Sequence, residues 1–170
     1  IVGEVRGREA YVLFQQIATG HSSMATIHAD SVDRLVDRLT TPPISLPASL
    51  IASLDIIVFI VKIKYGQTYV RRIKGIFEVI GFDREKNLPL VNELFRWNSK
   101  TDNYDVVNKS TVLKKISDQF GISGGFVQKE ITRRAKLINW MIEKKIFDYV
   151  DVAKIIKTYY SRPDDLMNKL

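Results

Sequence analysis

The sequence predicts an α/β fold whose character changes twice along its 170 residues. Residues 1–54 alternate between short strand-like runs and amphipathic helical segments, which is the rhythm of a parallel sheet flanked by helices. Residues 56–107 consist of β-rich runs separated by turns, as in an antiparallel meander. From Ser110 onward the apolar residues recur at helical spacing, so we expect a C-terminal helical subdomain.

The first part of the chain is expected to contain two helices. A strand at the start leads into a helix over residues 8–18, and Gly20 suits the turn beyond its end. A short strand over residues 22–28 precedes the second helix, which Asp30 or Ser31 can cap. The apolar stripe of the second helix consists of Val32, Leu35, Val36 and Leu39.

The middle of the chain predicts four antiparallel strands. Residues 56–65 and 68–82 form a hairpin, because Gly66 can open a two-residue turn between them. A third strand is expected over residues 88–97, and a short fourth strand over residues 104–107. This succession of adjacent strands joined by turns indicates a meander.

Charge separates the last third of the chain from the rest. Residues 109–170 carry 13 Lys and Arg against 7 Asp and Glu, whereas residues 1–108 carry 13 against 12. We therefore place a domain boundary near Asn108, followed by a basic helical subdomain. Such a surface suits an acidic partner, anionic lipid or nucleic acid, and a solvated lysine-rich helix surface is the simpler interpretation. Its longest helix has an apolar stripe of Val127, Ile131, Ala135, Ile138 and Ile142.

Composition excludes several kinds of site. The sequence has no cysteine, so disulfides, thiolate metal ligands and cysteine nucleophiles are absent. The longest apolar run, residues 56–61, is far too short to cross a bilayer.

Three side chains suggest chemistry in the first part of the chain. Glu4 lies at the end of the first strand, and His21 and His28 are the two histidines of the sequence. A carboxylate at a strand end, followed by clustered imidazoles, is suited to handling phosphate groups. Taken alone, each of these residues also fits an ordinary structural position, so the combination carries the hypothesis.

Longer motifs around these residues resemble the secretion traffic ATPases, the motors of type II secretion, type IV pili and the archaeal flagellum. The matching runs are Gly3-Glu4-Val5-Arg6 with Glu9-Ala10, Thr19-Gly20-His21, and Thr26-Ile27-His28. The variant His28-Ala29-Asp30 and the pair Arg71-Arg72 resemble the archaeal branch. The resemblance runs from residue 1 to about residue 98, and more loosely to the end.

The resemblance implies a RecA-like nucleotide-binding sheet that hydrolyses ATP with Mg²⁺. It also implies a hexameric ring of identical subunits and a polytopic membrane protein as the platform partner. The protein would then act in the cytoplasm, at the cytoplasmic face of the membrane. A role in secretion, pilus assembly or archaellum assembly is not distinguished by these motifs.

The resemblance also assigns roles to individual residues. Glu4 matches the Walker B glutamate that contacts magnesium through water and polarises the nucleophile, and His28 matches the histidine-box residue near the terminal phosphate. The expected nucleotide-binding or supporting residues are Arg6, His21, Arg71 and Arg72. The expected structural residues of the site are Gly3, Glu9, Gly20 and Thr26. For Arg6 and Glu9 an internal ion pair is as good an explanation as ligand contact.

One element of the family is absent from the sequence. No Gly-x-x-x-x-Gly-Lys-Ser/Thr motif occurs, so the backbone cradle and the lysine that hold nucleotide phosphates are missing. We therefore expect a C-terminal fragment of the motor, with further chain before Ile1. By itself this fragment should be inactive and should bind nucleotide very weakly.

A different function is indicated by the start of the helical part. Residues 117–123 have the spacing of a helix-turn-helix, followed by a helix with Lys129, Arg133, Arg134 and Lys136. Nucleic-acid binding is therefore the alternative, although two glycines at the start of the second helix make it the less favoured one. A third interpretation is that these helices dock onto a membrane-embedded partner.

Overall fold

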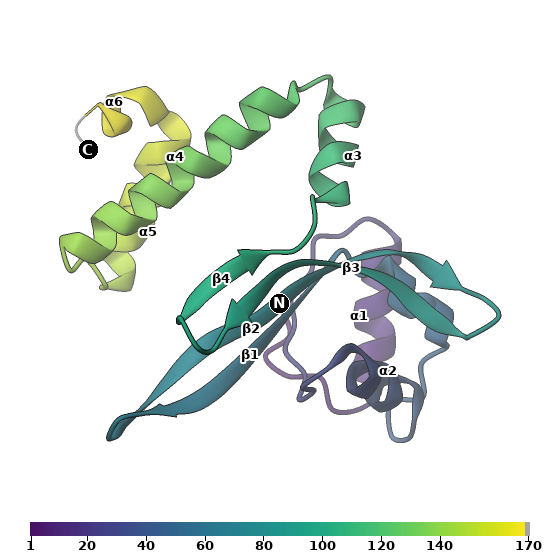
Figure 1. The fold of residues 1–170 in the computed structure, drawn as a ribbon. Coiled ribbons are helices and arrows are strands. Elements are labelled where there is room, and N and C mark those ends of the chain that lie inside the picture. Colours follow the sequence, from purple (N-terminus) through teal and green to yellow (C-terminus); the bar gives the residue numbers. More distant parts are fainter. Residues whose placement is uncertain (169–170) are drawn as a thin grey trace. The chain divides into compact units, whose positions relative to one another are not determined.

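Two compact units follow one another along the chain, Ile1–Val112 and Leu113–Leu170. The computed structural model describes residues 1–168. The expected α/β class is confirmed, because the first unit combines helices with a four-stranded antiparallel sheet and helices follow toward the C-terminus (Figure 1). None of the helices described over residues 1–168 is long and apolar enough to span a bilayer.

The sheet of the first unit is an antiparallel meander in the order β1-β2-β3-β4. Its strands are β1 (Ile56–Tyr65), β2 (Thr68–Asp83), β3 (Leu88–Asn98) and β4 (Asn103–Val106). Gly66 opens the β1–β2 turn with a φ of 58°, a left-handed conformation that glycine adopts without strain. The predicted hairpin and its two neighbouring strands are therefore confirmed.

The segment before the sheet contains three helices. They are α1 (Glu9–Ala18), α2 (Val32–Thr40) and the 3₁₀ helix η1 (Ala48–Ser53). The parallel pairing predicted here is limited to one bridge between Val2 and Ala25, because among the described residues no further strand extends it. Ser31 caps α2 by accepting a hydrogen bond from the Arg34 backbone N–H, which settles the choice between Asp30 and Ser31.

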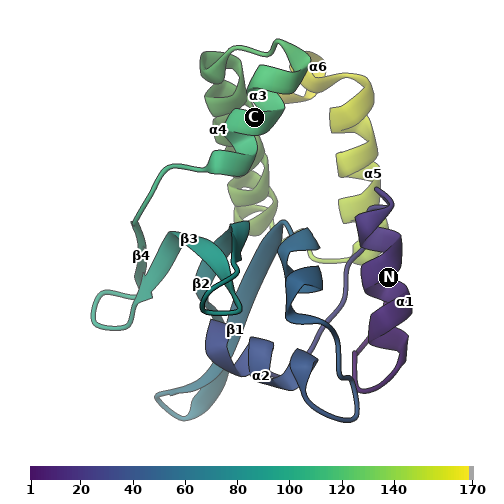
Figure 2. The same cartoon turned by 90° about the vertical axis from the view of Figure 1, so that its right-hand side faces the viewer.

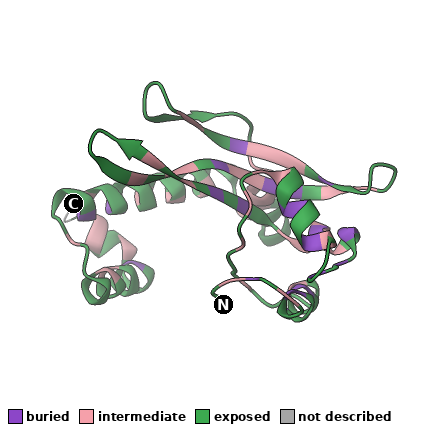
Figure 3. Cartoon of the chain, turned by 90° about the horizontal axis from the view of Figure 1, so that it is seen from below, coloured by how far each residue is buried: buried purple, intermediate pink, exposed green. Residues whose placement is uncertain are grey.

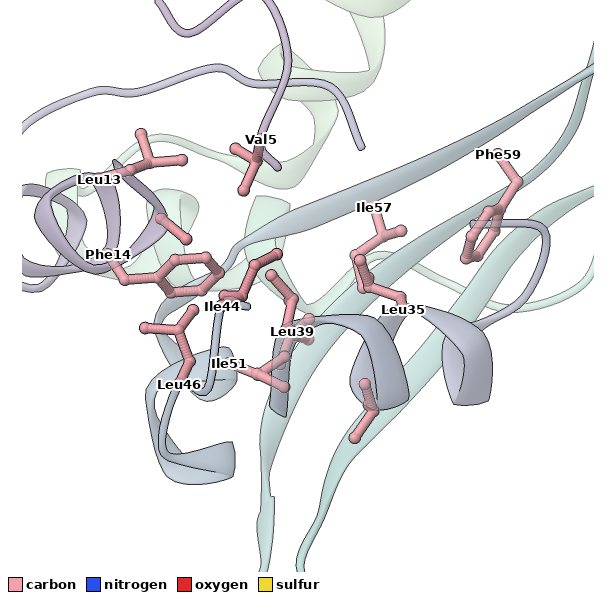
Figure 4. Packing of buried hydrophobic residues seen from close by; sticks show 13 residues of the cluster. Val5, Leu13, Phe14, Leu35, Leu39, Ile44, Leu46, Ile51, Ile57 and Phe59 are labelled. Carbon is pink, nitrogen blue, oxygen red and sulfur yellow. The ribbon is translucent and has the colours of Figure 1, made fainter. Parts of the chain in front are cut away.

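The core of the first unit lies where α1 and α2 meet strand β1 (Figure 4). Helix α1 contributes Leu13 and Phe14, and the stripe of α2 packs beside Ile57 and Phe59, as Figure 2 shows for α2 and β1. The buried cluster contains Val5, Ala10, Leu13, Phe14, Leu35, Val36, Leu39, Ile44, Leu46, Ile51, Ile57, Phe59 and Val79. Because Val5 belongs to this cluster, the neighbouring Glu4 is fixed to the rigid part of the unit.

A buried carboxylate joins the sheet to the start of α3 (Thr111–Phe120). Glu78 in β2 is 1% exposed and accepts hydrogen bonds from Thr111 N at 2.7 Å and Thr111 Oγ1 at 2.8 Å. Ser110 Oγ, Val112 N and Asn92 Nδ2 also donate to it. Burial is the largest influence and raises the pKa of Glu78, but the hydrogen bonds outweigh it and leave the pKa lowered.

The second unit contains the remaining helices, α4 (Gly124–Glu143), α5 (Tyr149–Ser161) and α6 (Pro163–Met167). Its buried residues are Leu137, Met141 and Tyr159, and buried positions are fewer here than in the first unit (Figure 3). The predicted stripe of α4 does not face this core, since Ile138 and Ile142 are 52% and 55% exposed. Helix α4 has apolar residues on two sides, and the side with Leu137 is the one that packs on α5.

Candidate functional site

The position of Glu4 is set by backbone pairing with residues 24–26. Val2 N donates to Met24 O at 2.9 Å, and Val5 N donates to Thr26 O at 2.8 Å. The Thr26 hydroxyl also donates to the carbonyl of Gly3. These hydrogen bonds hold the residues on either side of Glu4 in register with the segment that leads to His28.

The structure brings Glu4, Arg6 and His28 together. Arg6 Nη2 lies 2.6 Å from Glu4 Oε2, and His28 Nε2 lies 3.1 Å from Glu4 Oε1. The His28 contact lacks hydrogen-bond geometry, so the buried Oε1 atom has no hydrogen-bond partner. One oxygen of Glu4 is thus held firmly, while the other remains able to accept a hydrogen bond from a ligand or a water.

Positive charge surrounds the Glu4 carboxylate. The hydrogen bond from Arg6 is the largest influence and lowers the pKa of Glu4, whereas partial burial opposes it. The charges of Arg6, His28 and Arg38 lower this pKa further. The carboxylate is therefore ionised at neutral pH.

Of the residues expected to be structural at the site, Glu9 and Gly20 have a clear local role, whereas Gly3 does not. Glu9 Oε1 accepts hydrogen bonds from Arg6 N at 2.6 Å and Gly7 N at 2.8 Å, so it satisfies backbone donors at the start of α1. Gly20 follows α1 with a φ of 88°, which is strained for other residues. A Cβ atom added at Gly3 would contact no neighbouring atom, so the structure does not require glycine there for lack of space.

His21 makes a local contact. Its Nδ1 lies 3.1 Å from the hydroxyl of Thr19, and the two side chains are exposed. His28, in contrast, contacts Glu4, which lies on a different segment. Among the residues described, the geometry therefore pairs only one of the two histidines with the carboxylate.

An open hollow of about 1550 Å³ lies beside these residues in the first unit. Its lining includes Arg6 and His28, the segment from Gly20 to Asp30, and the polar face of α2 with Arg34 and Arg38. The space is large enough for a nucleotide-sized ligand. Its wall carries Arg6, Arg34 and Arg38 but also Asp30, Asp37 and Asp55, so a negatively charged ligand would meet individual arginines rather than a net positive charge.

The first unit also has a sequence relationship that fits this geometry. Residues 1–73, which contain Glu4, Arg6, His21 and His28, match the family described as type II/IV secretion system protein. The chain is therefore similar to this family over the part that contains the site. The matched segment ends within β2, so the family match covers the site but not the helical second unit.

Three archaeal proteins are similar to a larger part of the chain. Uncharacterized protein MJ1287 of Methanocaldococcus jannaschii is 35% identical over 145 residues, covering 85% of this chain and 54% of the relative. Uncharacterized protein MJ0900 of the same organism is 32% identical over 166 residues, covering 95% and 30%. Uncharacterized protein MJ0781 is 23% identical over 145 residues, covering 85% and 20%. The chain therefore spans about half or less of the length of these relatives.

The two arginines of the hairpin are placed differently from Arg6. Arg72 binds Asp102 through two hydrogen bonds of 2.8 Å, and Trp97 Nε1 donates to the same carboxylate at 2.8 Å. Arg71 is exposed on β2, and its side chain has no ion pair among the residues described. A role of either residue in nucleotide or subunit contact stays a prediction, and Arg72 already has a structural partner.

The family resemblance implies a magnesium ion, but few side chains here could bind one directly. No group of three or more acidic or histidine side chains able to hold a metal occurs among residues 1–168. Magnesium commonly uses one or two carboxylates together with substrate phosphates and water. Glu4 fits a contact through water, because its Oε1 atom can accept a hydrogen bond from a metal-bound water.

Two cationic residues near the site were not predicted. Arg38 on α2 lines the hollow and acts electrostatically on Glu4. Lys74 on β2 donates to the carbonyl of Asp30 at 2.9 Å and so fixes the end of the histidine segment. A local signal for Arg38 existed, because Arg34 and Arg38 are four residues apart on the polar face of a predicted helix. Lys74 had no such local signal.

Proposed function

We propose that the chain is the C-terminal part of an ATPase that powers protein secretion or the assembly of a pilus or archaellum. The observation that supports this most is the 3.1 Å approach of His28 to Glu4 beside a hollow lined by Arg6, Arg34 and Arg38. The family match over residues 1–73 supports the same class of activity. The phosphate-binding loop would come from another part of the whole protein.

In this proposal Glu4, Arg6 and His28 have different roles in ATP hydrolysis. Ionised Glu4 orients and polarises the attacking water, while Arg6 holds the carboxylate in place through the 2.6 Å hydrogen bond. His28 donates a hydrogen bond toward the terminal phosphate group. Magnesium, when bound, would neutralise phosphate charge, with Glu4 contacting it through water.

The assembly is part of the proposal. A hexameric ring would change the angle between neighbouring domains during ATP turnover and push on a polytopic membrane protein at the cytoplasmic face of the membrane. Residues 1–170 alone lack the phosphate-binding motif, so we expect no ATP hydrolysis and very weak nucleotide binding from them.

Glu4→Gln in the full-length protein tests the proposed chemistry. Glutamine keeps an acceptor for Arg6 but cannot act as a base, so turnover should fall about 100-fold or more while ATP affinity stays within about threefold. Phosphate release gives turnover, and a fluorescent ATP analogue gives affinity. Glu85→Gln, in the exposed turn after β2, is the control and should keep wild-type turnover. Wild-type turnover by Glu4→Gln would remove Glu4 from the mechanism.

Nucleic-acid binding is a second candidate because the predicted turn forms. Gly121 has a φ of 63° between α3 and α4, and Lys129 and Lys136 line an open groove on α4. However, Arg133 and Arg134 already bind Asp164 and Glu130, and α3 has no buried residue. Binding of duplex DNA measured against salt separates the two functions: a steep salt dependence favours DNA binding, and no binding at low salt removes it.

A further inference from the structure

Helix α2 presents two arginines toward the hollow from a fixed position. Leu35, Val36 and Leu39 are buried on one side of the helix, and Ser31 caps its first turn. Arg34 and Arg38 lie one turn apart on the opposite, exposed side, and both line the hollow. The helix therefore holds both guanidinium groups at the wall of the same space without using them in the core.

The arginines of this wall differ in whether they already have a partner. Arg6 is bound to Glu4 at 2.6 Å, and Arg34 Nη1 lies 3.9 Å from Asp37 Oδ2. Arg38 makes no hydrogen bond or ion pair with any of the residues described. The charge of Arg38 is therefore not paired with a carboxylate, and Arg38 lines the same hollow as Arg6 and His28.

Arg38 also acts electrostatically on Glu4, whereas Arg34 is not among the charges that act on that carboxylate. The positive charge of Arg38 contributes to lowering the pKa of Glu4, after the hydrogen bond and charge of Arg6 and the charge of His28. A phosphate group bound beside ionised Glu4 would be repelled by it. A further cation at this position would offset that repulsion, and Arg6 is occupied by Glu4 itself.

We propose that Arg38 binds the terminal phosphate group of the nucleotide from the α2 wall of the hollow. This inference rests on the proposed ATPase function. A guanidinium group suits the role because it can donate two parallel hydrogen bonds to phosphate oxygens. Since this contact requires the terminal phosphate, it should favour ATP over ADP.

Arg38→Gln and Arg34→Gln in the full-length protein form a matched pair for the test. Both residues are exposed, lie on α2 and line the hollow, but only Arg38 lies within electrostatic reach of Glu4. Arg38→Gln should weaken ATP binding about tenfold or more and lower turnover, while ADP affinity changes less than about threefold. Arg34→Gln should change each quantity less than about twofold. Fluorescent-nucleotide competition and phosphate release provide the measurements.

The Arg38→Lys variant keeps the test decisive if the glutamine variant does not fold. Lysine retains the charge but not the paired donors, so its ATP affinity should lie below that of the wild type, with ADP affinity preserved. An equal loss of ATP and ADP affinity, or wild-type ATP affinity and turnover in both variants, would overturn the role of Arg38 alone. A full-length protein that neither binds nor hydrolyses ATP would overturn the proposed function, and this inference with it.

Discussion

Glu4 and Asp102 each bind an arginine within the first unit, but they differ in how fully their oxygens are used. Asp102 receives two hydrogen bonds from Arg72 and one from Trp97, all of 2.8 Å. Glu4 receives one from Arg6, and its Oε1 has no hydrogen-bond partner. Exposure does not explain the difference, because the Glu4 side chain is 26% exposed and that of Asp102 is 37% exposed. A carboxylate whose two oxygens are both hydrogen-bonded stabilises the fold, whereas a carboxylate with an unpaired oxygen can still accept a hydrogen bond from a ligand.

The largest effect should come from exchanging the two carboxylates for amides. In the full-length protein Glu4→Gln should lower ATP turnover about 100-fold or more, whereas Asp102→Asn should leave it within about twofold. The reason is that Asp102 joins the β3–β4 turn to β2, whereas Glu4 contacts Arg6 and His28, which line the hollow. Phosphate release from both variants at saturating ATP measures the difference. A comparable loss of turnover in both variants would contradict the distinction between the two sites.

A third carboxylate, Glu78, extends the comparison because it is buried and both of its oxygens accept hydrogen bonds. Glu78→Gln places an NH₂ group where one oxygen accepts hydrogen bonds, either from Ser110 Oγ and Val112 N or from Thr111 N and Thr111 Oγ1, so buried donors lose their acceptor. The free energy of unfolding of the first unit should fall by about 1–3 kcal/mol.

Urea unfolding measures this loss of stability. In a Trp140→Phe background the remaining tryptophan, Trp97, lies in β3 and reports on the first unit. Asp102→Asn in the same background is the control and should destabilise the unit less, because Asp102 is partly exposed. Unfolding of Glu78→Gln at the wild-type urea concentration would show that the buried hydrogen bonds add no net stability.

The smallest expected effect concerns acid pH. The hydrogen bonds from Arg72 and then Trp97 lower the pKa of Asp102 to about 2, from a usual value of 3.8. A lowered pKa means that the stabilisation is complete above the unfolded-state value and is lost as the pH falls through about 2. The difference in stability between wild type and Asp102→Asn should therefore be constant near neutral pH and shrink between about pH 4 and about pH 2. Urea midpoints at several pH values test this, and a difference independent of pH would contradict it.

Local patterns in the sequence were sufficient for most elements. The stripe of α2 and the turn at Gly66 are confirmed, since each depends on periodicity or on one residue's backbone freedom. The stripe predicted for α4 was wrong as a core assignment, because that helix has apolar residues on two sides and only tertiary packing selects Leu137 and Met141. Periodicity alone cannot choose between two apolar faces.

The candidate site was predictable in its members but not in its geometry. The sequence singled out Glu4 and His28, and the structure places them 3.1 Å apart, while their roles in catalysis stay predictions. The unsatisfied oxygen of Glu4 depends on the angle of the His28 ring, which no motif specifies. The position of Arg38 depends on how α2 packs against the N-terminal segment with Val5, which is a long-range property of the fold.

The bridge between Val2 and Ala25 has a consequence for the length of the chain near the site. The next residue, Thr26, accepts a backbone hydrogen bond from Val5 N, and His28 follows two residues later. Removing one residue after Ala25 would therefore turn the imidazole away from Glu4, whereas the loop between Gly20 and Ala25 could absorb a change of length. Homologous chains that carry this site should vary in length before the bridge and be invariant in length after it.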